Sequence, residues 1–254
     1  MRVRNDSPGS DRESGQRAVA GRRGAGRPPP LAVGRRPADT DLLPRKLPRQ
    51  ARSRATFNAI VDACGQMLAL NPYDALTTNC ISERAGVSIG TLYEYFPNRE
   101  SIVAALVESS CERLVRRMSL AMEEADGLPA FVGVELLIAA GVEALGDQRN
   151  AFKVLVRDAP FVVQLPAFRR ARESLTDLCQ TIRARAGARL NLPLPIADTW
   201  LISQMLFTAM FEIAVLEAPE SQRASLRHEL SRLTFRMALG RDPEAADVGL
   251  TIYA

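Results

Sequence analysis

The segment TTNCISERAGVSIGTLYEYFPNRE, residues 77–100, decides how the rest of the chain is interpreted. Thr77 is a typical helix N-cap, and Gly86 is the kind of residue that ends a helix in the left-handed conformation. Ser88 can cap a following helix that runs to about Tyr95. Two short helices joined by a glycine-containing turn predict a helix-turn-helix, in which the second helix enters the major groove of DNA.

The side chains of this segment suit contact with DNA. A helix in a major groove about 12 Å wide needs exposed residues that are small or able to form hydrogen bonds, as Gly90 and Thr91 are. Tyr93 and Tyr95 can donate phenolic O–H groups to phosphates, and Arg99 can bind a phosphate together with helix N-terminal amides. The residues that we expect to contact DNA are Arg49, Thr77, Thr78, Ser88, Ile89, Gly90, Thr91, Tyr93, Tyr95 and Arg99.

Each of these residues also has an explanation without DNA. Tyr93 and Tyr95 can be half-buried packing residues, as helical tyrosines commonly are. Thr77 and Ser88 act as caps in any helical protein, and some helix-turn-helix motifs are purely structural. The combined density of the motif, rather than any single residue, indicates DNA binding.

Helical patterning extends in both directions from the motif. Residues 51–70 place apolar side chains at three- and four-residue spacings, and Asn71-Pro72 ends that pattern. We expect an all-α fold, with a three-helix helix-turn-helix head followed by a larger helical ligand-binding and dimerisation domain. The expected helices of that larger domain lie near residues 99–124, 129–146, 149–157, 166–187, 195–217 and 220–239.

Charge is distributed unevenly. The net charge is +4, but residues 1–50 hold 12 basic residues against 5 acidic ones, whereas residues 51–110 hold 4 against 6. Residues 1–43 are rich in Gly, Pro, Arg and Ser, which is typical of a disordered tail or an over-long translated start, and alternatively of a basic arm that attracts phosphates. We expect residues 45–54 to supply much of the attraction to DNA. The expected divisions are a tail over 1–44, a DNA-binding domain over 45–97, a ligand-binding and dimerisation domain over 98–240, and a tail over 241–254.

The residues Ile81-Ser82-Glu83-Arg84-Ala85-Gly86-Val87-Ser88, Gly90-Thr91-Leu92-Tyr93, Tyr95-Phe96 and Asn98-Arg99-Glu100 carry a family resemblance. Over about residues 49–108 the chain resembles the DNA-binding head of the TetR family of bacterial repressors. The resemblance implies a cytoplasmic transcriptional regulator, expected to be a repressor, that binds a pseudo-palindromic operator as a homodimer and is released by a small effector. The rest of the chain resembles the family only in its helical length and layout.

The same resemblance implies an effector site within residues 110–217 and dimerisation through the last two long helices. Apolar residues there suggest a hydrophobic effector, although each of them can equally fill the core. The candidate ligand-binding residues are Phe131, Phe152, Phe161, Phe168, Trp200, Gln204 and Phe207. The expected dimer interface contains Met210, Leu226, Leu230, Leu233 and Met237, because helix 195–217 is apolar nearly all round and needs a second cover.

The sequence carries no set of residues that indicates catalysis. It contains one histidine, His228, and four widely spaced cysteines without a C-x-x-C pair, so we expect reduced thiols, no metal, no cofactor and no enzymatic activity. The longest apolar run is too short and too polar to suggest a membrane span. Two other functions stay open: a helix-turn-helix nucleoid or adaptor protein without a small-molecule switch and, less favoured, a helical-bundle enzyme.

Overall fold

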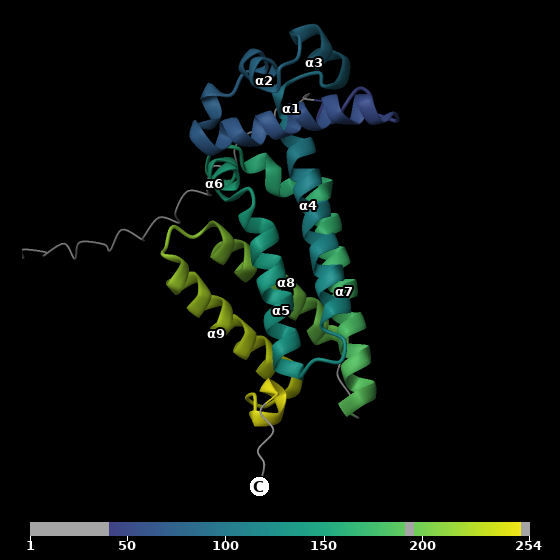
Figure 1. Cartoon of the computed structure of the whole chain (residues 1–254), viewed down its shortest axis with the longest axis vertical. Coiled ribbons are helices and arrows are strands. Elements are labelled where there is room, and N and C mark those ends of the chain that lie inside the picture. Colours follow the sequence, from purple (N-terminus) through teal and green to yellow (C-terminus); the bar gives the residue numbers. More distant parts are fainter. Residues whose placement is uncertain (1–40, 191–195, 250–254) are drawn as a thin grey trace, which may run out of the picture. The chain divides into compact units, whose positions relative to one another are not determined.

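The computed structural model describes residues 41–190 and 196–249, and every regular element in these ranges is helical (Figure 1). The expectation of an all-α fold is therefore confirmed. The α-helices are α1 (Ala51–Leu70), α2 (Thr78–Ala85), α3 (Ile89–Tyr95), α4 (Arg99–Glu124), α5 (Ala130–Gly146), α6 (Arg149–Asp158), α7 (Pro166–Leu190), α8 (Ile196–Val215) and α9 (Glu220–Leu239). Three short 3-10 helices join them: η1 (Tyr73–Ala75), η2 (Pro160–Gln164) and η3 (Ala245–Val248).

Local capping groups set the boundaries of the helix-turn-helix. The Thr77 side chain accepts a hydrogen bond from the Cys80 amide at 3.2 Å, and Ser88 accepts one from the Thr91 amide at 3.0 Å. Gly86 ends α2 with φ 68°, a left-handed conformation that glycine adopts without a steric penalty. Asn98 caps α4 by accepting a hydrogen bond from the Ser101 amide at 2.7 Å. The predictions for Thr77, Gly86 and Ser88 are confirmed.

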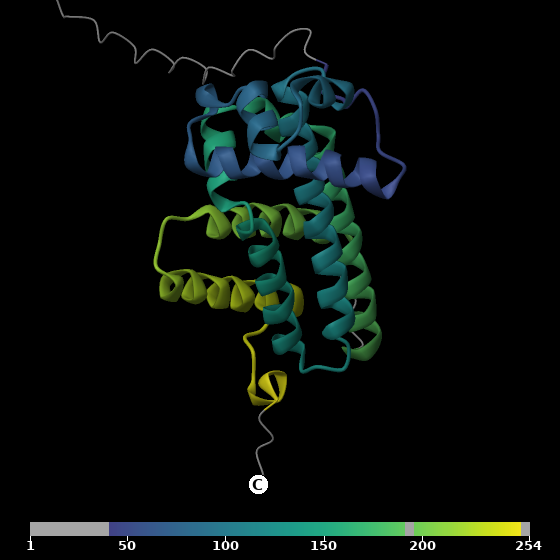
Figure 2. The ribbon, with the colours of Figure 1, turned by 45° about the horizontal axis from the view of Figure 1, so that its top comes forward.

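The head is built on one apolar cluster. Ile60 of α1, Ile81 of α2, Leu92 of α3 and Phe96 are completely buried within it. The first turns of α4 enter the same cluster through Ile102, so α4 belongs to both the head and the larger domain. Figure 2 shows α2 and α3 on α1, above the long helices of the larger domain.

The larger domain places α4, α5 and α7 side by side, with α8 and α9 against α5 (Figure 1). Gly141 of α5 permits close helix packing, because a Cβ there would lie 2.5 Å from Met210 Sδ and 2.9 Å from Met118 Sδ. The head rests on this domain through contacts of α1 with α4 and α6.

The structure describes most of the expected C-terminal tail but almost none of the expected N-terminal one. Residues 1–40 lie outside the described residues. Residues 241–249, expected to be part of a tail, form η3 and pack on α5. Polar contacts within the segment order it: Arg241 Nη1 donates to Asp247 Oδ2 at 2.5 Å, and the Glu244 amide donates to the same oxygen at 2.9 Å. Within the described ranges, no helix combines the length and hydropathy that a membrane span requires.

Candidate nucleic-acid interface

The N-terminal end of α3 is an open surface of small and polar groups. Ser88, Ile89 and Gly90 are exposed and Thr91 is half-buried. A Cβ on Gly90 would meet only Ser88 Oγ, at 3.8 Å, so nothing in the head covers this position. The Ser88 and Thr91 hydroxyls lie 2.9 Å apart and share a hydrogen bond. The arrangement matches what a recognition helix needs, because such a helix contacts base edges with its N-terminal residues.

Tyr93 is held in place by the preceding helix. Its hydroxyl and Thr78 Oγ1 lie 3.1 Å apart and share a hydrogen bond, while about 40% of Tyr93 is exposed. When Thr78 donates that bond, the phenolic O–H of Tyr93 stays available to donate to a phosphate. Arg84 Nε donates to Gln66 Oε1 at 2.9 Å and ties α2 to α1 in the same way. The contacts fix the orientation of α3 within the head.

Tyr95 does not belong to this surface. Only 6% of it is exposed, and its ring packs edge-on against Phe57 with centroids 6.1 Å apart. The expected phosphate contact is therefore corrected: with α3 starting at Ile89, Tyr95 faces α1, while Tyr93 two residues earlier faces outward. The packing interpretation that the sequence left open applies to Tyr95.

The Arg99 side chain also makes its contacts within the head. Its Nη1 donates to the carbonyl of Leu76 at 3.0 Å, its Nε donates to Glu100 Oε1 at 2.9 Å, and its guanidinium lies 4.6 Å from the ring centroid of Tyr73. Burial and the nearby Glu100 carboxylate raise the pKa of Tyr73 to about 12, so its hydroxyl stays protonated. Arg99 thus joins the η1 loop to α4, which corrects its expected role as a phosphate ligand.

The segment before α1 is docked on the far end of α3. The Arg45 amide donates to the carbonyl of Tyr95 at 2.8 Å, and Arg45 Nη1 donates to the carbonyl of Tyr93 at 3.0 Å. Asn98 Nδ2 donates to the carbonyl of Asp41 at 3.0 Å. The two Arg45 bonds satisfy C-terminal carbonyls of α3, where a cation is also favoured. Arg45 was missed as a docking residue, since its partners lie 48 and 50 positions away.

Exposed basic side chains continue from this docked segment. Lys46, Arg49, Arg52 and Arg54 are all exposed at the start of α1. Among the DNA-contact candidates, Arg49 therefore lies on the surface, and Thr77 and Thr78 lie at the start of α2, beside Tyr93. The head presents its basic groups around α1 and its hydroxyl groups on α2 and α3.

The ligand candidates are not gathered in one place. Phe168, Trp200 and Gln204 line a cavity of about 440 Å³ between η2, α7 and α8. Phe131, Phe152 and Phe207 are buried and paired edge-on with Phe235, Phe211 and Phe168, at 5.7, 5.9 and 6.2 Å. Phe161 is half-buried against the same core. These four line neither this cavity nor the one between α4, α5, α7 and α9, and their burial fits the core interpretation.

The residues expected at the dimer interface differ in how exposed they are. Met210 is only 2% exposed and lies over Gly141, so it belongs to the core of its own protomer and the expectation is corrected. Leu226, Leu233 and Met237 are 37%, 45% and 40% exposed along one side of α9, with Leu230 half-buried between them. Leu201 and Met205 of α8, which the sequence did not single out, are about half exposed. Among the dimer candidates, Leu226, Leu233 and Met237 are the residues exposed enough to contact a second chain.

Burial disfavours the thiolate form of three cysteines, Cys64, Cys111 and Cys179. Burial raises the pKa of the Cys64 and Cys111 thiols to about 12 and that of Cys179 to about 11, and all four cysteines are unpaired. His228 Nδ1 lies 2.7 Å from Glu135 Oε1 on the surface. In residues 41–190 and 196–249, no three His, Cys, Asp or Glu side chains are grouped to hold a metal ion.

Three similarities to known proteins bear on this interface. The profile of the family described as bacterial regulatory proteins, tetR family, matches residues 60–106. The chain is 32% identical over 73 residues to the fatty acid metabolism regulator protein of Bacillus subtilis (strain 168), covering 29% of this chain and 38% of that protein. It is 34% identical over 65 residues to the nucleoid occlusion factor SlmA of Shewanella baltica, covering 26% and 33%. The chain therefore matches about a third of the length of these curated relatives.

One solved structure extends the likeness beyond the head. The transcriptional regulator FadR from Bacillus subtilis, solved in complex with stearoyl-CoA, superposes with a TM-score of 0.55 over 73% of this chain and 99% of that one. The sequences are 19% identical over this alignment, so the likeness concerns the fold.

Proposed function

The chain belongs to the TetR family of bacterial regulatory proteins through its DNA-binding head, and from that premise we propose that it is a ligand-responsive transcriptional regulator. In this proposal it represses genes in the cytoplasm, binds a pseudo-palindromic operator as a homodimer, and leaves the operator when a small hydrophobic effector binds. The proposal needs no enzymatic step and no cofactor. Its main support is the open N-terminal face of α3, presented by a head that matches the family profile.

We assign the proposed functions to the domains expected from the sequence. We propose that residues 45–97 bind DNA and that residues 98–240 bind the effector and dimerise. Ser88, Gly90 and Thr91 face base edges, because they are small or hydroxyl-bearing and lie at the open end of α3. Thr77, Thr78 and Tyr93 contact phosphates, and Arg49 adds charge from the start of α1.

Dimerisation would cover the exposed apolar side of α9. Leu226, Leu233 and Met237 together with Leu201 and Met205 of α8 form an apolar surface that a single chain leaves in water. A second copy of the same surface can bury it around a two-fold axis. Two heads related by that axis suit half-sites about one helical turn of DNA apart, or somewhat more.

The nature of the effector is supported by the relatives. One relative is named a regulator of fatty acid metabolism, and the superposed regulator was solved with stearoyl-CoA. An effector with a large apolar part is the corresponding proposal for this chain. Its binding would favour a state of the two heads that fits the operator poorly, and the binding energies of effector and DNA would then be coupled reciprocally.

A gel shift with the DNA upstream of the chain's own gene tests the proposal. A discrete complex that resists moderate salt supports an operator-binding regulator, whereas only diffuse, salt-labile binding contradicts it. Thr91→Ala should alter preference at a single base step, while Tyr93→Phe should weaken binding to all sequences similarly. Uniform loss from Thr91→Ala would remove Thr91 from the base-reading face.

A second candidate function is a nucleoid-associated or adaptor protein without a small-molecule switch. The observation that favours it is the similarity of the head to a nucleoid occlusion factor. The two candidates differ in one measurement: an adaptor keeps its DNA affinity in the presence of every apolar ligand, whereas the regulator loses it with its effector.

A further inference from the structure

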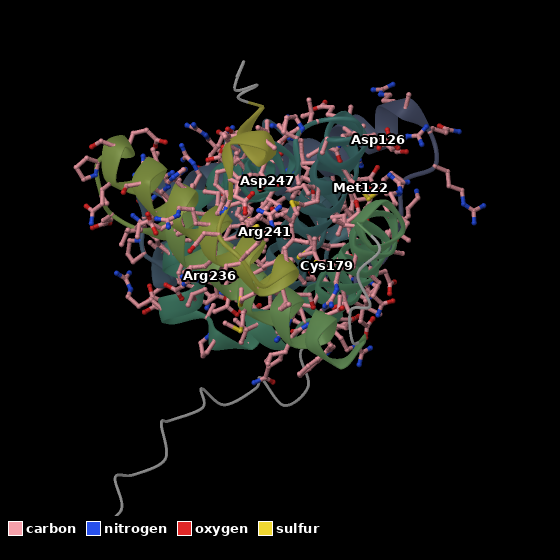
Figure 3. The ribbon with its side chains drawn as sticks, turned by 90° about the horizontal axis from the view of Figure 1, so that it is seen from below. Met122, Asp126, Cys179, Arg236, Arg241 and Asp247 are labelled. Carbon is pink, nitrogen blue, oxygen red and sulfur yellow. The ribbon has the colours of Figure 1, made fainter. Side chains whose placement is uncertain are left out.

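A second cavity lies at the end of α4 that is farthest from the head. It has a volume of about 320 Å³ and is enclosed by the last residues of α4, the first turns of α5, the C-terminal half of α7 and the end of α9. Figure 3 views this end of the molecule from below and labels Met122 near the end of α4 and Asp126 just after it. No local sequence pattern marks this site, because its walls come from four separate elements.

The cavity walls are mainly aliphatic. Phe235 is the one aromatic side chain among them, and it is held from outside by the Arg241 guanidinium, 5.5 Å from its ring centroid. Such a lining suits a flexible hydrocarbon chain better than a stacked ring. The aliphatic and thioether side chains are Met122, Leu128, Val134, Leu137, Ile182 and Leu239.

One wall carries positive charge. Arg183 and Arg185, two positions apart on α7, both line the cavity together with a single acidic residue, Asp126, so the lining has a net charge of +1. Arg183 Nη1 donates to Thr199 Oγ1 of α8 at 2.6 Å, which orients its guanidinium. Arg185 is exposed at the rim. Guanidinium groups bind carboxylates with paired hydrogen bonds.

The other cavity does not have this character. Its walls include Arg169, Glu173 and Asp177, and its polar side chains are engaged with each other: Arg172 Nε donates to Gln204 Oε1 at 2.5 Å, and Thr176 shares a hydrogen bond with Ser203 at 2.7 Å. An apolar chain placed there would separate polar partners, which costs free energy.

We propose that the cavity between α4, α5, α7 and α9 is the effector site, and that it takes an aliphatic molecule of medium length with a single anionic head group. The chain lies among the aliphatic walls and the head group binds Arg183 and Arg185. The volume is at the low end of the range for ligand pockets, roughly 300–1,000 Å³, so a bulky carrier on the head group stays outside. This inference rests on the proposed function, because it identifies the ligand of that regulator.

The cavity is connected to the head through α4. Met122 lines the cavity near the end of α4, whereas Ile102 in the second turn of α4 is completely buried in the core of the head. One continuous helix of about 39 Å therefore joins the two sites. A ligand that displaces the C-terminal end of α4 would also move the N-terminal end of this helix, which packs in the core of the head.

Isothermal titration of the purified full chain with sodium decanoate and with 1-decanol tests the proposal. Decanoate should bind about tenfold more tightly than decanol, because only the carboxylate can form charge-assisted hydrogen bonds with the arginines. Arg183→Gln with Arg185→Gln should remove that preference, while Arg169→Gln, an exposed arginine of the same helix at the other cavity, should leave it unchanged. Ala238→Phe should fill the cavity and weaken binding of both probes at least tenfold, and Ala184→Phe, exposed on α7, should not.

The outcomes separate this inference from the proposed function. Equal binding of the two probes, no binding of decanoate, or decanoate binding that survives Ala238→Phe in a chain with wild-type circular dichroism would overturn the cavity assignment. A gel shift that decanoate leaves intact would overturn its role as effector site even where it binds. Absence of any discrete DNA complex in the same gel would instead contradict the proposed function, whatever the titration gives.

Discussion

Arg45 and Arg99 both make contacts within the head that their positions in the sequence do not suggest. Arg99 follows a helix cap and was expected to hold a phosphate, yet its guanidinium bonds to Leu76 and Glu100. Arg45 lies in a segment expected to contribute only charge, yet it caps the carbonyls of Tyr93 and Tyr95. Apart from the adjacent Glu100, the bonding partners of Arg45 and Arg99 lie 23 to 50 positions away in the sequence. Sequence spacing does not reveal contacts between residues so far apart.

The docking by Arg45 predicts a difference between two adjacent basic residues. Arg45→Ala should weaken DNA binding about fivefold more than Lys46→Ala, because it removes a side-chain hydrogen bond of roughly 1 kcal/mol to α3 as well as a positive charge. Lys46 is exposed and serves as the matched control. Affinities measured over a salt series check this, and similar losses with similar salt slopes in the two variants would mean that Arg45 acts through charge alone.

The internal contacts of Arg99 predict a loss of stability. Arg99→Ala should lower the free energy of unfolding by about 1–3 kcal/mol, because the Leu76 carbonyl and the Glu100 carboxylate lose a charged donor. Arg52→Ala, at an exposed position of α1, should change it by less than about 0.5 kcal/mol. Urea unfolding followed by circular dichroism measures both. An Arg99 variant with unchanged stability but weakened DNA binding would restore the phosphate role.

At the scale of elements, the limits of the helices were largely predictable and the directions of their side chains were not. Thr77, Ser88 and Asn98 act on amides within three residues, so short sequence patterns reveal the start of a helix. Which side of an apolar helix faces inward depends on its neighbours. Met210 is buried because Gly141 of α5 leaves room for it, a pairing 69 positions apart that the periodicity of α8 does not contain.

The exposed side of α9 predicts the effect of one substitution on assembly. Leu233→Glu should convert a dimer into a monomer, because it places a charge in the centre of the apolar surface formed by Leu226, Leu233 and Met237. Leu120→Glu is the control, since Leu120 is equally exposed on α4, away from that surface. Sedimentation velocity distinguishes the two species. A wild-type chain that sediments as a monomer, or a Leu233→Glu chain that remains dimeric, contradicts the proposed interface.

At the scale of the whole molecule, contacts far from the motif complete the larger domain. The Arg241–Asp247 pair holds η3 on α5, and Gly249 approaches Pro129 so closely that a Cβ would lie 3.2 Å from its Cγ. Pro129 and Phe235 are walls of the cavity between α4, α5, α7 and α9. The chain after Gly240 therefore supports the proposed effector site, although its sequence lacks the apolar periodicity that marks an element.

This C-terminal contact predicts a dependence of stability on pH. The Arg241 guanidinium, and to a smaller degree the Glu244 amide, lower the pKa of Asp247 below its usual value of 3.8. A carboxyl with a lowered pKa in the folded chain stabilises it at every pH above the unfolded value, and this contribution disappears as the pH falls through the folded value. Asp247→Asn should therefore melt at a lower temperature than the wild type at pH 7, and the difference should shrink below about pH 4. Thermal melts at pH 7, 5 and 3 measure it, with Asp242→Asn, whose carboxylate is exposed, as the control. A difference in melting temperature that persists unchanged at pH 3 would show that the ionised Asp247 is not what holds η3 in place.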